Sequence, residues 1–241
     1  MNLVIDQGNT LVKLAVYSDG ELISHFSEKE LNLDILRKIF IEFPAVKRTI
    51  LSSVGIFGEE IPRFLNSISY FIKLDSKTPL PIINKYSTKD TLGYDRIANA
   101  VGAHTIYPSA NVLVIDAGTA ITFDLITAQG EFFGGNISPG LNLRFKSLNQ
   151  FTKKLPLVEK QDDFELIGTS TKGAILSGVM NAVIFEVDGY ISELKMKFPD
   201  IKIVLTGGDI NYFVKKLKNT IFVDSNLNLS GLNQILEFNA K

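Results

Sequence analysis

The chain has 241 residues, of which 45% are hydrophobic and 21% charged, and its formal net charge at pH 7 is −1. This balance excludes a largely disordered chain and gives no overall positive field for nucleic acid or an anionic membrane. Cysteine is absent, which excludes disulfides, thiolate nucleophiles and cysteine-held metal clusters. The first residues show no signal-peptide pattern and no run of about 18 apolar residues indicates a membrane span, so we expect a cytoplasmic protein.

An internal repeat comes first in chain order. Residues 2–23 align with residues 112–133, and this alignment superposes two LVID segments and two pairs of glycines. In each copy an apolar strand ends in Asp, a short glycine-containing turn follows, and two further strands come after it. Duplication of a three-stranded antiparallel unit explains the match better than coincidence between two hairpins, which is the alternative.

Helices and single strands follow each copy of the repeat. After the first copy we expect a helix within 28–43, a strand over 46–54, a helix over 58–68, a strand over 70–74 and a helix over 94–107. After the second copy we expect a helix to about 150, with Pro139 in its first turn, and then a surface loop over 152–166. A helix over 170–197 and a strand over 201–205 should follow, and then helices over 209–218 and 230–238. Strands joined by crossover helices predict a layered α/β fold with parallel pairing.

Three glycine-containing turns could bind a nucleotide. In DQGNT (residues 6–10) the glycine allows close approach to a ligand, backbone N–H groups can face phosphate oxygens, and the Asp can hold Mg²⁺. DAGTAIT (residues 116–122) repeats this turn. In LTGGD (residues 205–209) the double glycine would let an adenosine moiety lie against the backbone. Each turn alone also fits an ordinary hairpin or strand–helix joint.

The segment GYDR (residues 93–96) opens a predicted helix. A carboxylate in the first helical turn, here Asp95, can accept a proton from an alcohol. The guanidinium group of Arg96 can bind a substrate carboxylate through two hydrogen bonds. The alternative is a favourable contact of Asp95 with the helix dipole and an ordinary surface arginine.

Five segments resemble, in order, those of type III pantothenate kinases, within the acetate and sugar kinase/Hsp70/actin superfamily. They are DQGNTLVK, LGYDRIANAVGA, DAGTAITFD, GGNISPGL and LTGGD. The resemblance runs over nearly the whole chain. It implies an α/β, actin-like ATPase fold of two duplicated ribonuclease-H-like lobes, about 1–108 and 109–241, with a central cleft. It also implies phosphorylation of pantothenate to 4′-phosphopantothenate at the start of coenzyme A synthesis, with ATP, Mg²⁺ and a monovalent cation (K⁺ or NH₄⁺). A homodimer, with the pantothenate pocket near the subunit interface, is implied as well.

The resemblance also implies a role for each candidate residue. Asp95 would be the general base, and Asp6 and Asp116 would hold Mg²⁺ and the monovalent cation. The nucleotide would be bound by Asp6, Gln7, Gly8, Asn9, Thr10, Lys13, Thr119, Gly207 and Gly208. The substrate would be bound by Tyr86, Gly93, Tyr94, Asp95, Arg96 and Thr171. Lys89 stands where relatives commonly have proline, so the approach to GYDR can differ in shape here.

Several alternatives stay open. Thr171 also fits a helix N-cap, and Tyr86 also fits an ordinary loop aromatic. The substrate could be another small hydroxylated molecule, since the nucleotide-binding turns would be similar in such a kinase. A regulator on the same fold that binds ATP without transferring phosphate is the third possible function.

Overall fold

The computed structural model describes residues 1–53, 55 and 58–240. The chain forms two compact units. Unit 1 contains residues 1–108, 130–132 and those from Asn226 onward, and unit 2 contains residues 109–129 and 133–225. The final helix therefore belongs to unit 1 by its contacts, whereas the lobe limits of 1–108 and 109–241 stay a prediction.

Unit 1 is built on a five-stranded sheet in the order β3-β2-β1-β4-β5. Its strands are β1 (Asn2–Gln7), β2 (Val12–Ser18), β3 (Glu21–Glu28), β4 (Arg48–Ser53) and β5 (Tyr70–Lys73). The first three strands pair antiparallel, whereas β4 pairs parallel with both β1 and β5. The parallel pairs follow from the two crossover helices, α1 (Leu33–Glu42) and α2 (Glu60–Ile68), that join β3 to β4 and β4 to β5.

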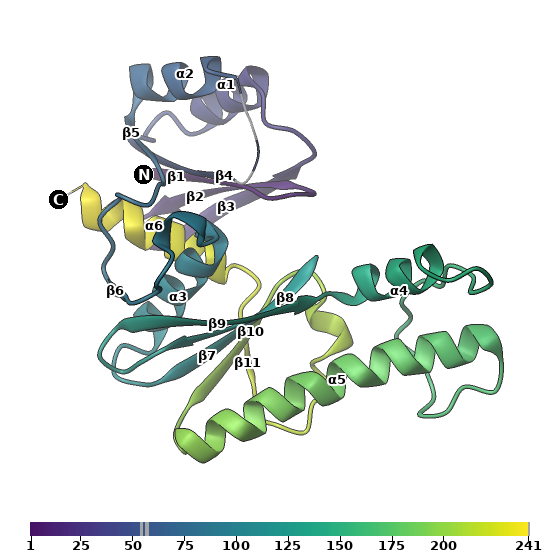
Figure 1. The fold of residues 1–241 in the computed structure, drawn as a ribbon. Coiled ribbons are helices and arrows are strands. Elements are labelled where there is room, and N and C mark those ends of the chain that lie inside the picture. Colours follow the sequence, from purple (N-terminus) through teal and green to yellow (C-terminus); the bar gives the residue numbers. More distant parts are fainter. Residues whose placement is uncertain (54, 56–57, 241) are drawn as a thin grey trace. The chain divides into compact units, whose positions relative to one another are not determined.

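Helices cover both faces of this sheet (Figure 1). Because side chains alternate along a strand, Leu3 and Ile5 of β1 face α1 and α2, and they share one buried cluster with Leu36 and Leu65 of those helices. On the other face lies α6 (Leu227–Asn239), which contacts β1, β2 and β4 and packs closely on α3 (Tyr94–Ile106). The start of α3, where GYDR lies, is thereby fixed within unit 1.

Two short elements of unit 1 lie between β5 and α3. The strand β6 (Ile83–Asn84) pairs parallel with Glu131 and Phe132, which are the first residues of β9 (Glu131–Pro139). The 3₁₀ helix η1 (Lys89–Thr91) then leads to Leu92 and the start of α3. Lys89 is therefore the first residue of a tight turn shortly before GYDR.

The second sheet has the strand order β11-β10-β7-β8-β9-β6, and unit 2 contains its strands from β11 to β8 and β9 from Phe133 onward. Its other strands are β7 (Val112–Ala117), β8 (Ala120–Ile126), β10 (Lys202–Thr206) and β11 (Phe222–Val223). β7 pairs antiparallel with β8 and parallel with β10, as β1 does with β2 and β4. This shared arrangement confirms that the sequence repeat corresponds to a repeated strand unit.

The helices of unit 2 are α4 (Leu141–Gln150), α5 (Thr171–Lys197) and the 3₁₀ helix η2 (Ile210–Tyr212). By length and composition alone, α5 is apolar enough to cross a membrane. However, its residues Val183, Val187 and Ile191 are fully buried in one cluster with Leu113 and Leu205 of the sheet, along which α5 runs (Figure 1). Its apolar composition is therefore explained by packing in the core of unit 2.

Most predicted elements are present, but three predictions are wrong in detail. The first helix does not start at 28, because β3 continues to Glu28 and Asn32 caps α1 by accepting a hydrogen bond from the Ile35 N–H at 3.0 Å. Pro139 ends β9 rather than starting a helix, and Gly140 is the N-cap of α4. The predicted helix over 209–218 is reduced to η2 and turns. Val54, the last residue of the predicted strand 46–54, lies outside the described residues.

Candidate active site

The turn between β1 and β2 is closed at its base. The Gly8 N–H donates a hydrogen bond to the Leu11 carbonyl at 3.1 Å. Asp6 lies directly opposite Lys13 in the antiparallel register, so these two side chains are neighbours on one face of the sheet. The turn therefore places a carboxylate and an ammonium group beside exposed backbone; its exposed residues are Gly8, Asn9, Thr10 and Leu11.

Gln7 is held to the neighbouring strand rather than projecting freely from the turn. The Ser53 hydroxyl at the end of β4 donates a hydrogen bond to Oε1 of Gln7 at 3.1 Å. The parallel register places the same two residues opposite each other. The first acidic turn is thus fixed against two strands, and a nucleotide contact by Gln7 stays a prediction.

The carboxylate of Asp95 is held at the start of α3. Its Oδ1 accepts a hydrogen bond from the Arg96 N–H at 2.8 Å, one of the free N–H groups that begin every helix. A Cβ added to Gly93 would lie 2.4 Å from the same oxygen. Asn228 of α6 donates to the Asp95 backbone carbonyl at 3.3 Å. The carboxylate therefore occupies space that is available only because residue 93 is glycine.

The structure brings Arg96 and Tyr86 together, and their proposed substrate-binding role stays a prediction. Arg96 is only 4% exposed, so the alternative of a surface arginine is wrong. Its guanidinium carbon lies 5.3 Å from the centroid of the Tyr86 ring, a cation–π contact. The Tyr86 ring in turn lies 6.3 Å from that of Phe132. Tyr86 is thus part of a packed group with Arg96, while Tyr94 lines a small cavity beside Lys89.

The second acidic turn lies between β7 and β8. Asp116 is opposite Thr122 of β8 and beside Thr206 of β10. The Gly118 N–H donates to the Ala120 carbonyl at 3.0 Å, and Thr119 accepts a hydrogen bond from the Gly140 N–H at 3.0 Å through its own carbonyl. Among the described residues, the buried hydroxyl oxygen of Thr122 has no hydrogen-bond partner.

The double-glycine loop after β10 packs directly on this second turn. Gly207 has a φ of +101°, and a Cβ at this position would lie 2.4 Å from the Ala117 carbonyl oxygen and 2.5 Å from Oδ1 of Asp116. The Asp209 N–H donates to the Ala117 carbonyl at 2.9 Å. Gly208 is exposed, and apart from its chain neighbours no described residue lies within 4 Å of its hypothetical Cβ. Two turns predicted to bind nucleotide are therefore adjacent within unit 2.

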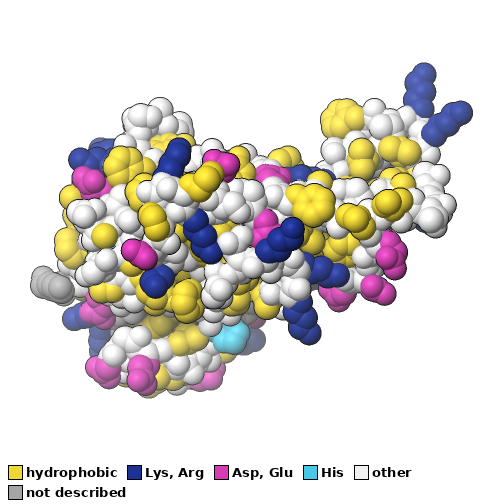
Figure 2. Space-filling view, turned by 90° about the horizontal axis from the view of Figure 1, so that it is seen from below, with side chains coloured by type: hydrophobic (Ala, Val, Ile, Leu, Met, Phe, Trp, Pro, Cys, Tyr) yellow, Lys and Arg dark blue, Asp and Glu magenta, His cyan; other side chains and the backbone are white. Residues whose placement is uncertain are grey.

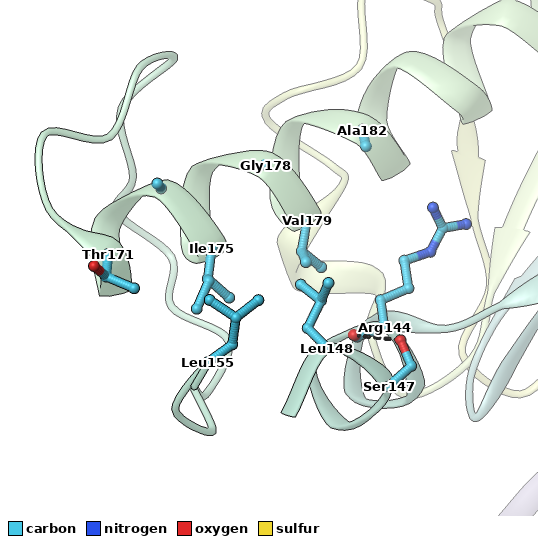
Figure 3. Close-up of a pocket in the computed structure, with 10 residues that line it drawn as sticks. Arg144, Ser147, Leu148, Leu155, Thr171, Ile175, Gly178, Val179 and Ala182 are labelled. Carbon is cyan, nitrogen blue, oxygen red and sulfur yellow. Dashed lines mark hydrogen bonds between the residues drawn. The ribbon is translucent and has the colours of Figure 1, made fainter. Parts of the chain in front are cut away.

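Thr171 lies elsewhere in unit 2, at one end of a cavity of about 650 Å³ between α4 and α5. Figure 3 shows Arg144 at the other end and the apolar side chains of Leu148, Ile175 and Val179 between them. Thr171 is the first residue of α5, and Ser170 is its N-cap, with Oγ accepting from the Gly173 N–H at 3.1 Å. The alternative of Thr171 as the N-cap is therefore wrong.

The described residues contain no cluster of three or more His, Cys, Asp or Glu side chains that could hold a metal ion by themselves. Mg²⁺ in nucleotide sites is commonly bound by one or two carboxylates, with phosphate oxygens and water as its other ligands. A single carboxylate in each acidic turn, Asp6 and Asp116, fits a site that a nucleotide completes.

Two contacts at the second acidic turn and the adjoining glycine loop could not be predicted from local sequence patterns. Gly140 binds the Thr119 carbonyl, although its segment GGNISPGL was noted only as part of the resemblance. Lys160 forms an ion pair with Asp209 across a separation of 49 residues. No local pattern marks Lys160, because it lies in a polar segment that fits a solvated loop equally well.

Comparison with solved structures identifies the fold. A Campylobacter jejuni protein provisionally described as a conserved Baf family transcriptional activator matches with a TM-score of 0.63 at 24% identity, over 99% of this chain and 98% of that one. Glucokinase from an Antarctic psychrotroph matches with a TM-score of 0.53 at 12% identity, over 98% of each chain. Together with the two sheets, these similarities confirm the predicted actin-like ATPase fold.

Sequence comparison identifies the family. The family model for type III pantothenate kinase matches residues 2–193. A type III pantothenate kinase of Phocaeicola vulgatus is 45% identical over 100% of both chains. Another, of Christiangramia forsetii, is 46% identical over 99% of both. The chain belongs to the type III pantothenate kinase family, a family of phosphotransferases.

Proposed function

We propose that this protein transfers the γ-phosphate of ATP to the primary hydroxyl of pantothenate and so forms 4′-phosphopantothenate, the first step of coenzyme A synthesis. The observation that carries this proposal is the family match, which includes GYDR and both acidic turns. The packed group at the start of α3 supports it, because a half-buried carboxylate lies next in sequence to a buried guanidinium group.

Asp95 is the proposed general base. Its carboxylate would accept the proton of the pantothenate hydroxyl as that oxygen attacks the γ-phosphorus. The Arg96 N–H and the space above Gly93 hold the carboxylate in one place before substrate binds. Arg96, with Tyr86, Gly93, Tyr94 and Thr171, is proposed to bind pantothenate, whose carboxylate suits a guanidinium partner.

The acidic turns and the glycine loop are proposed to bind ATP. Negative charge on the phosphates would be stabilised by Gln7, Gly8, Asn9, Thr10, Lys13 and Thr119. The adenosine moiety would lie against Gly207 and Gly208. Phosphoryl transfer depends mainly on alignment and electrostatic stabilisation. A site made of backbone turns, one lysine and one base fits that requirement.

Two cations complete the proposal. Asp6 would hold Mg²⁺, which when bound neutralises charge on the phosphates. Asp116 would hold K⁺ or NH₄⁺. The hydroxyl oxygen of Thr122, buried opposite Asp116 without a hydrogen-bond partner among the described residues, suits a site of oxygen ligands for such a cation.

The protein is further proposed to be a cytoplasmic homodimer that binds neither nucleic acid nor membrane. Two-fold dimers are the commonest oligomers. On the face shown in Figure 2, basic and acidic side chains are interspersed rather than gathered by sign. The formal net charge of −1 agrees with this picture.

An ADP-release assay tests the proposed function. With Mg²⁺, ATP, pantothenate and K⁺ we expect turnover, and with Na⁺ in place of K⁺ we expect much less. Asp95→Asn should keep ATP binding and lower kcat by about 10²–10⁴, the usual contribution of a general base. Turnover with a sugar but not with pantothenate would select the alternative kinase, and ATP binding without any turnover in the native protein would select the regulator.

A further inference from the structure

The segment between α4 and α5, residues 151–170, carries a lysine that reaches the glycine loop after β10. Nζ of Lys160 forms an ion pair with Oδ1 of Asp209 and lies 5.0 Å from the centroid of the Tyr212 ring. The side chain of Lys160 is 24% exposed and that of Asp209 is 10% exposed. The pair is largely shielded from water, so loss of the lysine would leave a carboxylate buried without its ion-pair partner.

Asp209 belongs to the loop that is proposed to bind adenosine. Its N–H holds the loop to the Ala117 carbonyl, and Gly207, two residues earlier, lies against Oδ1 of Asp116. Two acidic residues therefore flank the place where a nucleotide would enter. ATP brings several negative charges of its own, and like charges repel strongly where water is excluded. We therefore expect nucleotide to bind this loop more tightly when the charge of Asp209 is neutralised.

The backbone around Lys160 is held in place. Val158, two residues before it, is 8% exposed and belongs to the core cluster of unit 2. Asn149 of α4 donates to the Leu155 carbonyl at 2.9 Å, and Asn181 of α5 donates to the Glu165 carbonyl at 3.0 Å. Lys160 therefore extends toward Asp209 from a fixed segment, unlike a solvated surface lysine.

We propose that Lys160 is a positioning residue for the nucleotide. Through its ion pair it neutralises Asp209 and holds the Gly207–Asp209 loop against the second acidic turn, and this raises the affinity for ATP and ADP. The inference rests on the proposed function in one respect, namely that this loop contacts the nucleotide. Lys160 itself touches no reacting atom, so its loss should act on nucleotide affinity and not on the chemical step or on pantothenate binding.

Isothermal titration of the full chain with Mg·ADP tests the proposal. We expect Lys160→Ala to weaken binding about tenfold, and Lys160→Arg, which keeps the positive charge, to stay within about threefold of the native protein. Because the repulsive charge is then gone, the double variant Lys160→Ala with Asp209→Asn should bind more tightly than Lys160→Ala alone. Lys154→Ala, at an exposed lysine of the same segment, is the matched control and should bind normally.

Steady-state kinetics and thermal unfolding separate positioning from a merely structural role. The KM for ATP should rise in Lys160→Ala while kcat and the KM for pantothenate change less than twofold. Native-like nucleotide affinity in Lys160→Ala, with only a lowered Tm, would refute the proposal. If Lys160→Ala does not fold, Lys160→Gln, which also removes the positive charge, takes its place. An unchanged affinity of Lys160→Gln for Mg·ADP would likewise refute the proposal. Failure of the native protein to bind Mg·ADP would instead overturn the proposed function itself.

Discussion

Replacing Gly207 by alanine should damage the nucleotide loop, and the cost can be worked out from its surroundings. An L-residue at a φ of +101° is strained by roughly 1–2 kcal/mol. The new Cβ would also lie 2.4 Å from the Ala117 carbonyl oxygen, about 1 Å closer than ordinary contact, and this neighbour is backbone that cannot rotate away. Together these terms predict a loss of about 2–4 kcal/mol in the free energy of unfolding of unit 2.

Gly208→Ala is the matched control for stability, because no described residue beyond its two chain neighbours has an atom within 4 Å of its hypothetical Cβ. Urea unfolding followed by circular dichroism should show a lowered midpoint for Gly207→Ala and less than about 0.5 kcal/mol of change for Gly208→Ala. Titration with Mg·ADP should show weaker binding in Gly207→Ala, since the loop must move away from Asp116. Equal stability of the two variants would refute the reasoning about Gly207.

Two further predictions concern unit 1. Gly93→Ala keeps an allowed backbone conformation, but its new Cβ displaces the Asp95 carboxylate. We therefore expect kcat to fall at least tenfold, while the affinity for Mg·ADP, measured by titration, stays the same. An unchanged kcat would contradict the placement of Asp95. Burial lowers the pKa of His104, and its Nδ1 has no hydrogen-bond partner among the described residues. Protons therefore bind the unfolded chain more tightly, and stability should fall as the pH drops through and below about 6.5. The free energy of unfolding, measured with urea, should fall less between pH 7.5 and 5.5 in His104→Gln than in the native protein. An equal fall in both proteins would exclude His104 as the cause of the pH dependence.

The repeated parts of the fold could be predicted because their signals are local. In each copy of the repeat, apolar strand segments lie between glycine-containing turns. Asp6 and Asp116 could therefore be assigned to strand ends. The N-cap of α1, Asn32, is of a residue type that favours this position, but the predicted helix was not started there. The error at this helix came from extending the apolar period too far toward the N-terminus.

The elements that failed depend on contacts between distant residues. The apolar spacing over 209–218 is helical, but the Asp188 carboxylate of α5 accepts the Lys218 N–H at 3.1 Å and Lys160 binds Asp209. These contacts favour tight turns with i→i+3 hydrogen bonds, such as that from Phe213 to Ile210. The two-residue strand β6 exists only through its pairing with residues 131 and 132. Local helix and strand propensities do not predict either contact, because each joins residues that are distant in sequence.

The same distinction applies to the candidate site. The acidic turns, GYDR and the double glycine were found because each is contiguous in sequence. Lys160 was missed because its partner lies 49 residues away. The substrate-binding role of Arg96 stays a prediction, and its burial against the Tyr86 ring follows from packing that the sequence alone does not reveal.

The carboxylate of Asp95 at the start of α3 is proposed to accept the proton of an alcohol during phosphoryl transfer. The most direct measurement is a single-turnover reaction of ATP labelled in its γ-phosphate with pantothenate, followed by ³¹P NMR of the product. We predict that native protein places the label on the primary hydroxyl of pantothenate and that Asp95→Asn, with nucleotide still bound, transfers it at least about 10²-fold more slowly. Equal rates in the two proteins, or no labelled pantothenate from native protein saturated with ATP, would contradict the claim.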